Sequence, residues 1–223
     1  MLFDWLITGQ VVASNPASAV RGPKHVVSKG KTPVLSAEAT RTLLDSLPTD
    51  TELGLRDRAL IALLVYTFAR IGATVAMNVQ DVFTQQGRLW VRLHEKGGKE
   101  HTMPAHHNLE AYLNEYLDAT GIRGDAKGPL FRTARGRAQT LSRFRLRANN
   151  ALDMVRRRAL AAGIATPVTN HTFRATGITT YMKNGGQLER AQAMAAHSST
   201  RTTQLYNRKD DEVTLDEVER ILI

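Results

Sequence analysis

The sequence predicts a mainly α-helical domain with one small antiparallel β-sheet, an α+β fold. Most of its apolar residues recur at the spacing that places them on one face of a helix. One stretch, residues 87–104, instead alternates apolar and polar side chains around a Gly-Gly pair, which is typical of a β-hairpin. With 42 % hydrophobic residues among 223 and no long low-complexity tract, the chain can bury one substantial core.

Residues 1–32 are predicted to form a short helix followed by a basic linker. The segment "LFDWLI" has helical apolar spacing, and Asp4 together with the lack of a basic flank argues against a signal peptide. Residues 15–33 contain three prolines and two glycines, so we expect an extended connection there and a second domain over 33–223. Three lysines of this linker are expected to contact a polyanion: Lys24, Lys29 and Lys31.

Two helices and the hairpin are predicted next. Ser36 is placed to cap a helix that runs to about Leu47. The segment "LRDRALIALLVYTFA" is apolar on too many sides for a surface helix, so it should cross the core and end at Arg70. In the hairpin that follows, Lys96 and Lys99 flank the turn.

The second half of the chain is predicted to be helical as well. The segment "HNLEAYLNEYLDATG" has one apolar face and a C-terminal stop at Gly121. An arginine-rich stretch over 131–158 leads into a helix that ends near Gly163. Further helices are expected around 170–184, 187–196 and 200–206, and over the final segment "VTLDEVERILI".

The charge of the chain favours a polyanionic partner. Thirty Lys and Arg against 21 Asp and Glu give a net charge of +9 and a pI near 10.2. Nucleic acid is therefore the first candidate partner, and an anionic membrane surface is the second. Besides the linker lysines, we expect phosphate contacts from the hairpin and the arginine-rich stretch, namely Lys99, Arg132, Arg135, Arg137, Arg143 and Arg145.

Several classes of site are disfavoured by residue types. Cysteine is absent, which excludes disulfides and thiolate zinc sites. No stretch reaches the roughly 18 consecutive apolar residues of a membrane span, so we expect a soluble protein. The segment "KGGKE" lacks the flanking residues of a phosphate-binding loop. We expect no metal site, because four histidines lack acidic partners at ligand spacing: His94, His101, His106 and His107.

Six other polar residues are candidates for a shared site: Arg70, Lys96, His171, Arg174, His197 and Tyr206. His171 and Arg174 lie three residues apart on a predicted helix, so they share a face. The guanidinium of Arg70 follows an apolar helix and would need an anion, unless it caps the carbonyls at the end of that helix. Tyr206 has almost only polar neighbours, which indicates a role for its hydroxyl rather than for core packing.

Four motifs contain these six residues in order: "FARIGA", "HEKGGKEHTMP", "HTFRATGITTYMKNGG" and "AAHSSTRTTQLY". Together they resemble the catalytic domain of the tyrosine recombinases, the family of the phage-integrase and Xer-like site-specific recombinases. The resemblance covers the chain from about residue 33 to residue 223. It implies the fold of that catalytic domain, the family's catalytic roles for all six residues, and double-stranded DNA as the partner.

The residue types suit the implied chemistry. A tyrosine hydroxyl, with a pKa of about 10, is a poor nucleophile unless its anion is stabilised as it forms. Two guanidiniums can hold the non-bridging phosphate oxygens, and the hairpin lysine can protonate the leaving 5′-oxygen. One histidine can assist proton transfer from the phenol and the other can bond the phosphate. No metal or other cofactor is required by this scheme.

The sequence departs from the family pattern in three places. Family members often have an acidic residue three positions after the first arginine, where this chain has Ala73. The segment "ATGITTY" lacks the histidine that usually follows the second arginine. The family also has an N-terminal core-binding domain, of which residues 1–32 would be the last helix and linker. Neither of the first two departures removes a residue with a direct chemical role.

The function that the resemblance implies is site-specific DNA recombination through a 3′-phosphotyrosyl intermediate. Two alternatives stay open: a type IB topoisomerase-like enzyme and a non-catalytic DNA-binding module. The resemblance also implies that the C-terminal helix, residues 212–223, passes to a neighbouring protomer and links a tetramer on DNA. The other interpretation of this helix is that it docks on its own body. We expect a cytoplasmic location, with the protein at the nucleoid when it is bound to DNA.

Overall fold

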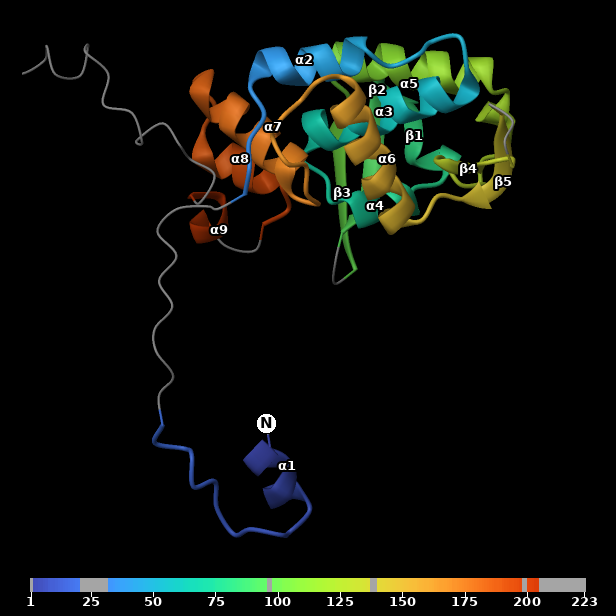
Figure 1. The fold of residues 1–223 in the computed structure, drawn as a ribbon. Coiled ribbons are helices and arrows are strands. Elements are labelled where there is room, and N and C mark those ends of the chain that lie inside the picture. Colours follow the sequence, from blue (N-terminus) through green and yellow to red (C-terminus); the bar gives the residue numbers. More distant parts are fainter. Residues whose placement is uncertain (1, 21–31, 96–97, 137–139, 198–199, 205–223) are drawn as a thin grey trace, which may run out of the picture.

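The computed structural model describes residues 2–20, 32–95, 98–136, 140–197 and 200–204, and it shows the α+β fold predicted from the sequence (Figure 1). The helices are α1 (Leu2–Thr8), α2 (Ala37–Asp45), α3 (Glu52–Thr67), α4 (Ile71–Ala76), α5 (His107–Ala119), α6 (Ala148–Ala161), α7 (Thr172–Lys183), α8 (Leu188–Met194) and α9 (Thr200–Gln204). Two short 3₁₀ turns are η1 (Val79–Asp81) and η2 (Ile122–Gly124). The strands are β1 (Val82–Gln85), β2 (Arg88–Glu95), β3 (Lys99–Pro104), β4 (Arg132–Ala134) and β5 (Leu141–Arg145).

Helix α3 is the centre of the core, as its apolar sequence predicts. Almost every side chain from Leu55 to Leu64 is buried, and α3 packs against α5, α6 and α7. Its N-terminus is capped by Thr51, whose hydroxyl accepts a hydrogen bond from the Gly54 backbone nitrogen at 3.1 Å. The helix ends three residues before Arg70, because Phe68 adopts a left-handed conformation with φ of 56°.

The contact between α3 and α7 positions part of the candidate site. Gly177 lies where α7 crosses the end of α3, and a Cβ there would come within 2.4 Å of the Val65 carbonyl oxygen and 2.5 Å of the Phe68 ring. Only glycine allows the two backbones to approach this closely. Arg174, one turn earlier on α7, is thereby brought next to the segment that leaves α3.

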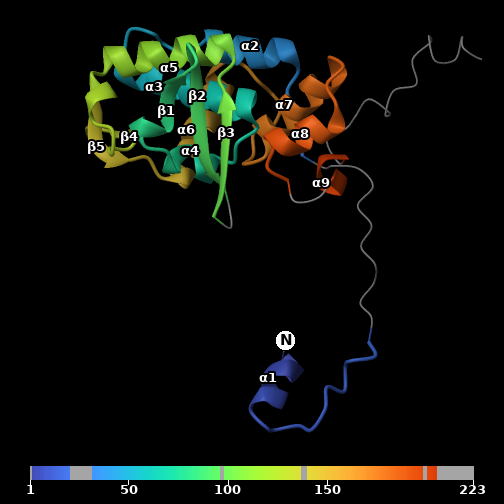
Figure 2. The same cartoon turned by 180° about the vertical axis from the view of Figure 1, so that it is seen from behind.

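The predicted hairpin is confirmed as the β2–β3 pair of a three-stranded antiparallel sheet in the order β1-β2-β3. Its register pairs Val91 with Val82 on one side and with Met103 on the other, and pairs Glu95 with Lys99. Figures 1 and 2 show that β2 and β3 extend toward the side of the body where α4 and α9 lie, whereas α2 and α5 run along the opposite side.

Strands β1, β4 and β5 and helix α4 were not predicted from the sequence. Strands β4 and β5 form a second, two-stranded antiparallel sheet within the arginine-rich stretch. The strands are short and mostly polar, so they lack the apolar alternation by which strands are recognised. The six-residue helix α4 is too short to show an amphipathic period.

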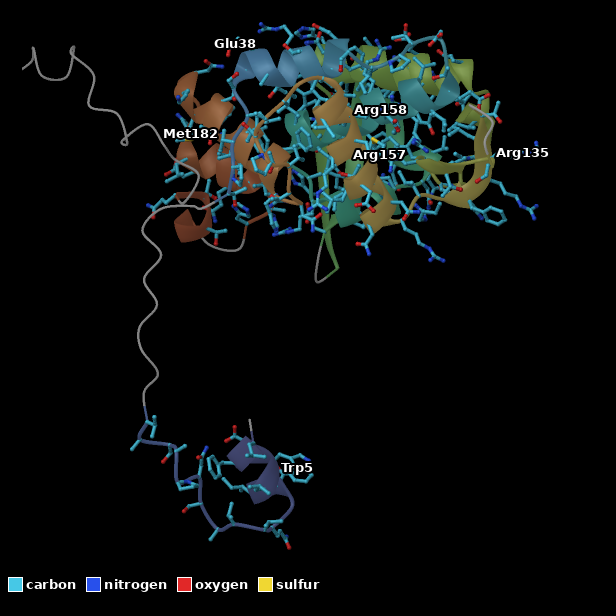
Figure 3. The ribbon with its side chains drawn as sticks, viewed as in Figure 1. Trp5, Glu38, Arg135, Arg157, Arg158 and Met182 are labelled. Carbon is cyan, nitrogen blue, oxygen red and sulfur yellow. The ribbon has the colours of Figure 1, made fainter. Side chains whose placement is uncertain are left out.

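Helix α1 agrees with the helix expected near the N-terminus, and none of its residues is buried; the Trp5 side chain is exposed (Figure 3). The division of the chain at residue 33 stays a prediction.

The expected C-terminal helix lies outside the described residues. Within the part of the chain that the structure describes, every helix is too short or too polar to cross a bilayer.

Candidate active site

Two arginines that are far apart in the sequence meet at one carboxylate. Arg70 lies between α3 and α4, Arg174 lies in the first turn of α7, and Glu95 is the last residue of β2. Arg70 Nη1 donates a hydrogen bond to Glu95 Oε2, and Arg174 Nη2 donates to Glu95 Oε1 at 3.3 Å. The anion that Arg70 was expected to need is therefore, in this structure, the carboxylate of Glu95.

Arg174 is fixed from a second direction as well. Its side chain is only 2 % exposed, and its Nη1 donates to the carbonyl oxygen of Ala195, just after α8, at 2.8 Å. The Glu95 side chain is 3 % exposed, whereas that of Arg70 is 36 % exposed. A buried guanidinium is tolerated when a charged partner and hydrogen-bond acceptors replace the lost water, and the Glu95 carboxylate and the Ala195 carbonyl oxygen do so at the two Nη atoms.

His197 lies beside this arginine pair and is bonded to α9. Its Nδ1 is 2.9 Å from the hydroxyl oxygen of Thr203, and the residue is buried. Burial lowers the pKa of His197 to about 4, and the positive charges of Arg174 and Arg70 act in the same direction. The imidazole is therefore neutral near pH 7, with one nitrogen that donates and one that accepts hydrogen bonds.

His171 occupies the N-cap position of α7 and is exposed, and its side chain makes no capping hydrogen bond. Its pKa is lowered, first by partial loss of water around the ring and then by the charges of Arg174 and Arg70. The dependence of both histidine pKa values on the same two arginines shows that these four side chains share one electrostatic environment. Two guanidiniums and one carboxylate give this environment a net positive charge, which suits an anionic ligand.

Four of the six predicted site residues are thus brought together. The other two, Lys96 and Tyr206, lie outside the described residues. Their neighbours in the sequence are part of the cluster: Lys96 directly follows Glu95, and Tyr206 comes two residues after the end of α9.

Glu95 was missed by the sequence analysis, although a signal was present. The inward positions of β2 are Leu89, Val91 and Leu93, and the same alternation continues to Glu95. A carboxylate on the buried face of a strand requires cationic partners. Across the sheet from Leu93 lies His101, whose pKa is lowered by burial and by Arg174 against an opposing effect of Glu95.

The predicted DNA-contact residues differ in their surroundings. Arg135 is exposed after β4 (Figure 3), and Arg143 is exposed on β5, with its guanidinium 5.5 Å from the centre of the Phe144 ring. Lys99 pairs with Glu95 in the hairpin register. Four predicted DNA-contact residues lie outside the part of the chain that the structure describes: Lys24, Lys29, Lys31 and Arg137.

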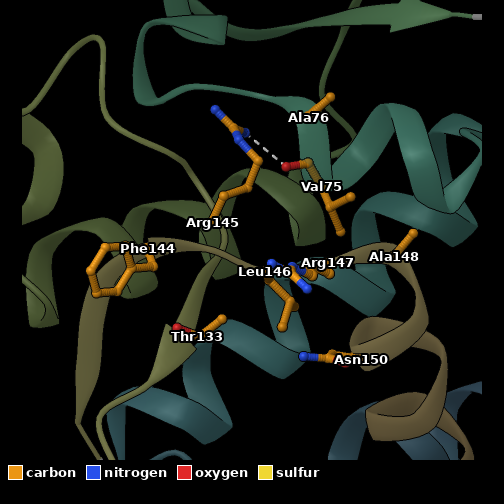
Figure 4. A pocket seen from close by; sticks show the side chains of 9 residues that line it. All are labelled: Val75, Ala76, Thr133, Phe144, Arg145, Leu146, Arg147, Ala148 and Asn150. Atoms are coloured by element: carbon orange, nitrogen blue, oxygen red, sulfur yellow. Dashed lines mark hydrogen bonds between the residues drawn. The ribbon is translucent and has the colours of Figure 1, made fainter.

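Two arginines predicted to contact DNA make polar contacts within the chain. Arg132 is buried, donates to Pro129 O at 3.0 Å and forms an ion pair with Asp125 at 2.6 Å. Arg145 Nη1 donates to the carbonyl oxygens of Val75 and Met77, both at 2.8 Å. Figure 4 shows this contact with Val75 at an open groove of about 710 Å³ between α4, β5 and the start of α6. These geometries favour structural roles for both guanidiniums.

Comparison with known proteins identifies the family. The model of the phage integrase family matches residues 33–213. The chain belongs to the phage integrase family. Among curated proteins, this family member is 30 % identical over 207 residues to tyrosine recombinase XerD of Oceanobacillus iheyensis, a match that covers 91 % of the chain and 66 % of that protein. It is 26 % identical over 208 residues to tyrosine recombinase XerC of Escherichia coli O127:H6, covering 93 % of the chain and 66 % of the relative.

Solved structures of the same class share the fold of this family member. The crystal structure of XerA recombinase superposes with a TM-score of 0.63 at 23 % identity, covering 90 % of this chain and 65 % of that one. The pre-cleavage complex of XerH recombinase with difH gives a TM-score of 0.67 at 18 % identity, covering 98 % and 61 %. This confirms the predicted catalytic-domain fold. The chain spans just under two thirds of the length of these relatives.

Proposed function

We propose that this phage integrase family member is a site-specific recombinase that cleaves and rejoins DNA strands through a covalent bond to Tyr206. The observation that carries the proposal is the convergence of Arg70, Arg174, His171 and His197 on one cationic site. Relatives that are named tyrosine recombinases support it. So does the likeness to a recombinase bound to its DNA substrate.

The two arginines would hold the scissile phosphate. A guanidinium offers planar, paired donors that fit two phosphate oxygens, and it keeps its charge at every accessible pH. Negative charge grows on the non-bridging oxygens as the phenol attacks, so donors fixed in advance stabilise the transition state more than the ground state. Arg174, held by Glu95 and Ala195, provides such a fixed donor group.

The histidines and the hairpin lysine would handle protons. His197 is neutral near pH 7, and when the Thr203 hydroxyl donates to its Nδ1, its Nε2 carries a proton that can be donated to a phosphate oxygen. His171, which is also kept neutral, can accept the phenolic proton of Tyr206. Lys96, the residue that follows β2 in the sequence, can protonate the leaving 5′-oxygen.

The reaction balances without an external energy source. One P–O bond forms to the phenolic oxygen, one P–O bond breaks to the 5′-oxygen, and one proton leaves the phenol while another reaches the 5′-oxygen. The phosphotyrosine retains the energy of the broken phosphodiester. A 5′-hydroxyl from the same or another strand can therefore reverse the step and reseal the DNA.

A nicked suicide substrate tests the proposal. The short 5′ fragment diffuses away after cleavage, so wild-type protein should accumulate a covalent protein–DNA adduct, and Tyr206→Phe should form none. Specific DNA binding without an adduct would favour the non-catalytic DNA-binding module. Relaxation of supercoiled DNA by a monomer without strand exchange would favour the topoisomerase-like alternative.

We also propose that the DNA contacts come from seven of the predicted cations and not from Arg132 or Arg145, whose guanidiniums are bonded within the chain. Neutralising phosphates with these side chains releases counterions, so DNA affinity should fall steeply with salt. The protein would act in the cytoplasm, at the nucleoid when bound to DNA. The proposed contact residues are Lys24, Lys29, Lys31, Lys99, Arg135, Arg137 and Arg143.

Assembly on DNA is a further part of the proposal. Structural neighbours include a lambda integrase dimer bound to a core site and a lambda integrase tetramer bound to a Holliday junction. We propose a tetramer linked by exchange of residues 212–223, whose apolar residues can pack into a neighbour. Deleting 212–223 should leave a folded, DNA-binding protein that no longer forms the higher complex in sedimentation. Unfolding of the truncated chain would favour docking of the helix on its own body.

A further inference from the structure

We infer that Glu95 is a positioning residue that holds both arginines in the geometry needed to receive a phosphate. The inference rests on the proposed function, since the phosphate is that of the DNA strand. It assigns a role to a residue outside the six predicted ones. Its basis is the contact pattern, burial and charge of Glu95 in the structure.

The contact pattern is the first argument. Glu95 uses its two carboxylate oxygens on two different guanidiniums: Oε2 accepts from Arg70 and Oε1 accepts from Arg174 at 3.3 Å. One carboxylate therefore fixes the separation between side chains that come from α7 and from the α3–α4 connection. A phosphate bound by both arginines needs that separation to be set before it arrives.

Burial and charge are the second argument. The side chains of Glu95 and Arg174 are 3 % and 2 % exposed, so water screens the charge of Arg174 poorly, although the neighbouring Arg70 side chain is 36 % exposed. Without this carboxylate, the two guanidiniums would repel each other, and buried Arg174 would lose its ion pair with Glu95. The negative charge of Glu95 neutralises one of the two positive charges. The three side chains together keep a net positive charge, so the site can bind an anion.

The location of Glu95 is the third argument. It ends β2, and the next residue is Lys96, the proposed acid. Its inward orientation continues the buried side of the strand, which is anchored by Leu93 in the core. The strand end that positions the arginine pair is thus adjacent in the sequence to the proposed acid. On α4 the position three residues after Arg70 is the buried Ala73, which offers no carboxylate.

A second buried carboxylate with the same contact pattern provides a matched control. Asp57 on α3 accepts from Arg56 at 2.5 Å through one oxygen and from Arg158 at 2.8 Å through the other. Arg158 lies on α6 (Figure 3), and none of the candidate site residues is an ion-pair partner of Asp57 within the described residues. Loss of either carboxylate should destabilise the fold, but only loss of the Glu95 carboxylate should slow DNA cleavage.

The test compares Glu95→Gln with Asp57→Asn in the full chain. In single-turnover cleavage of the nicked substrate at saturating DNA, Glu95→Gln should be slower by about 100-fold, the loss typical of a misplacement of about 1 Å. Its DNA Kd should change by no more than a few-fold, because both cations remain. Asp57→Asn should cleave at close to the wild-type rate below its melting temperature. Glu95→Asp keeps the charge but cannot reach both guanidiniums. Its cleavage rate should lie between those of Glu95→Gln and wild type.

A measurement without DNA separates this inference from the proposed function. Guanidinium NMR signals of Arg70 and Arg174 should report slow rotation in the wild type and in Asp57→Asn, and faster rotation in Glu95→Gln. Should wild type form no covalent adduct, the proposed function fails, and the NMR comparison still decides whether Glu95 positions the arginines. Guanidinium signals of Glu95→Gln that match those of wild type, or a folded Glu95→Gln variant that cleaves within a few-fold of wild type, would overturn the inference.

Discussion

Acidification should destabilise this protein through His197 in particular. The pKa of His197 is lowered from 6.5 to about 4 in the folded chain, because the ring is buried next to cationic side chains. The unfolded chain takes up a proton on this imidazole as the pH falls through about 6.5, whereas the folded chain does not until about pH 4. The stabilising contribution of the neutral ring is therefore complete above pH 6.5 and is lost progressively as the pH falls toward 4.

The magnitude follows from the two pKa values. A gap between 6.5 and about 4 corresponds to about 3 kcal/mol of unfolding free energy when it is fully expressed. Between about pH 7.5 and about pH 5 the loss from His197 alone is about 2 kcal/mol, since the folded ring is still mostly neutral at the lower pH. A domain with a total stability of about 5–15 kcal/mol should show this change clearly.

The loss of unfolding free energy that comes from His197 can be measured by urea unfolding of wild type and His197→Gln at several pH values between about 5 and about 7.5. Glutamine can still bond the Thr203 hydroxyl but cannot titrate. The variant should therefore lose about 2 kcal/mol less than wild type over this pH range. His171→Gln is the comparison at an exposed ring and should change the pH dependence less. Equal losses in wild type and His197→Gln would refute the reasoning.

Three further substitutions test the site and its support. Arg174→Lys should slow cleavage by about 100-fold or more with little change in DNA Kd, because charge is kept and the planar donor pair is lost; equal losses of binding and cleavage would contradict this. Lys96→Ala should be rescued by DNA with sulfur at the 5′ leaving position, since a thiolate departs without a proton, and absence of rescue would remove Lys96 from the acid role. Arg145→Leu should lower the unfolding free energy by about 1–2 kcal/mol through lost carbonyl contacts, against less than about 0.5 for Arg143→Leu; similar values for both would refute the structural role.

The long elements were predictable because their side-chain patterns are local. The apolar sequence of α3 and the alternation of β2 each identify an element without reference to the rest of the chain. The β4–β5 sheet was not predictable in this way, because its strands are short and its pairing is decided by where the flanking segments pack. The same holds for α4, whose start after Arg70 depends on the left-handed turn at Phe68.

Which arginines are available to a ligand also depended on tertiary contacts. Arg132, Arg143 and Arg145 look alike in the sequence, as members of one basic stretch. In the structure Arg132 is buried, whereas Arg143 and Arg145 are both exposed, and the guanidiniums of Arg132 and Arg145 bond to carbonyl groups elsewhere in the chain. Charge along a sequence predicts the sign of a surface, but the distance to each acceptor is set by folding.

The sequence by itself determined the fold class, the family motifs, the positive charge and the inward position of Glu95 on its strand. These are properties of composition and of spacing within one element, and spacing decides which face a side chain occupies. The tertiary structure alone decided that Glu95 meets Arg70 and Arg174, and that Arg174 also meets the end of α8. The partners come from β2, α7 and the α3–α4 connection, and only packing of the shared core brings those segments together.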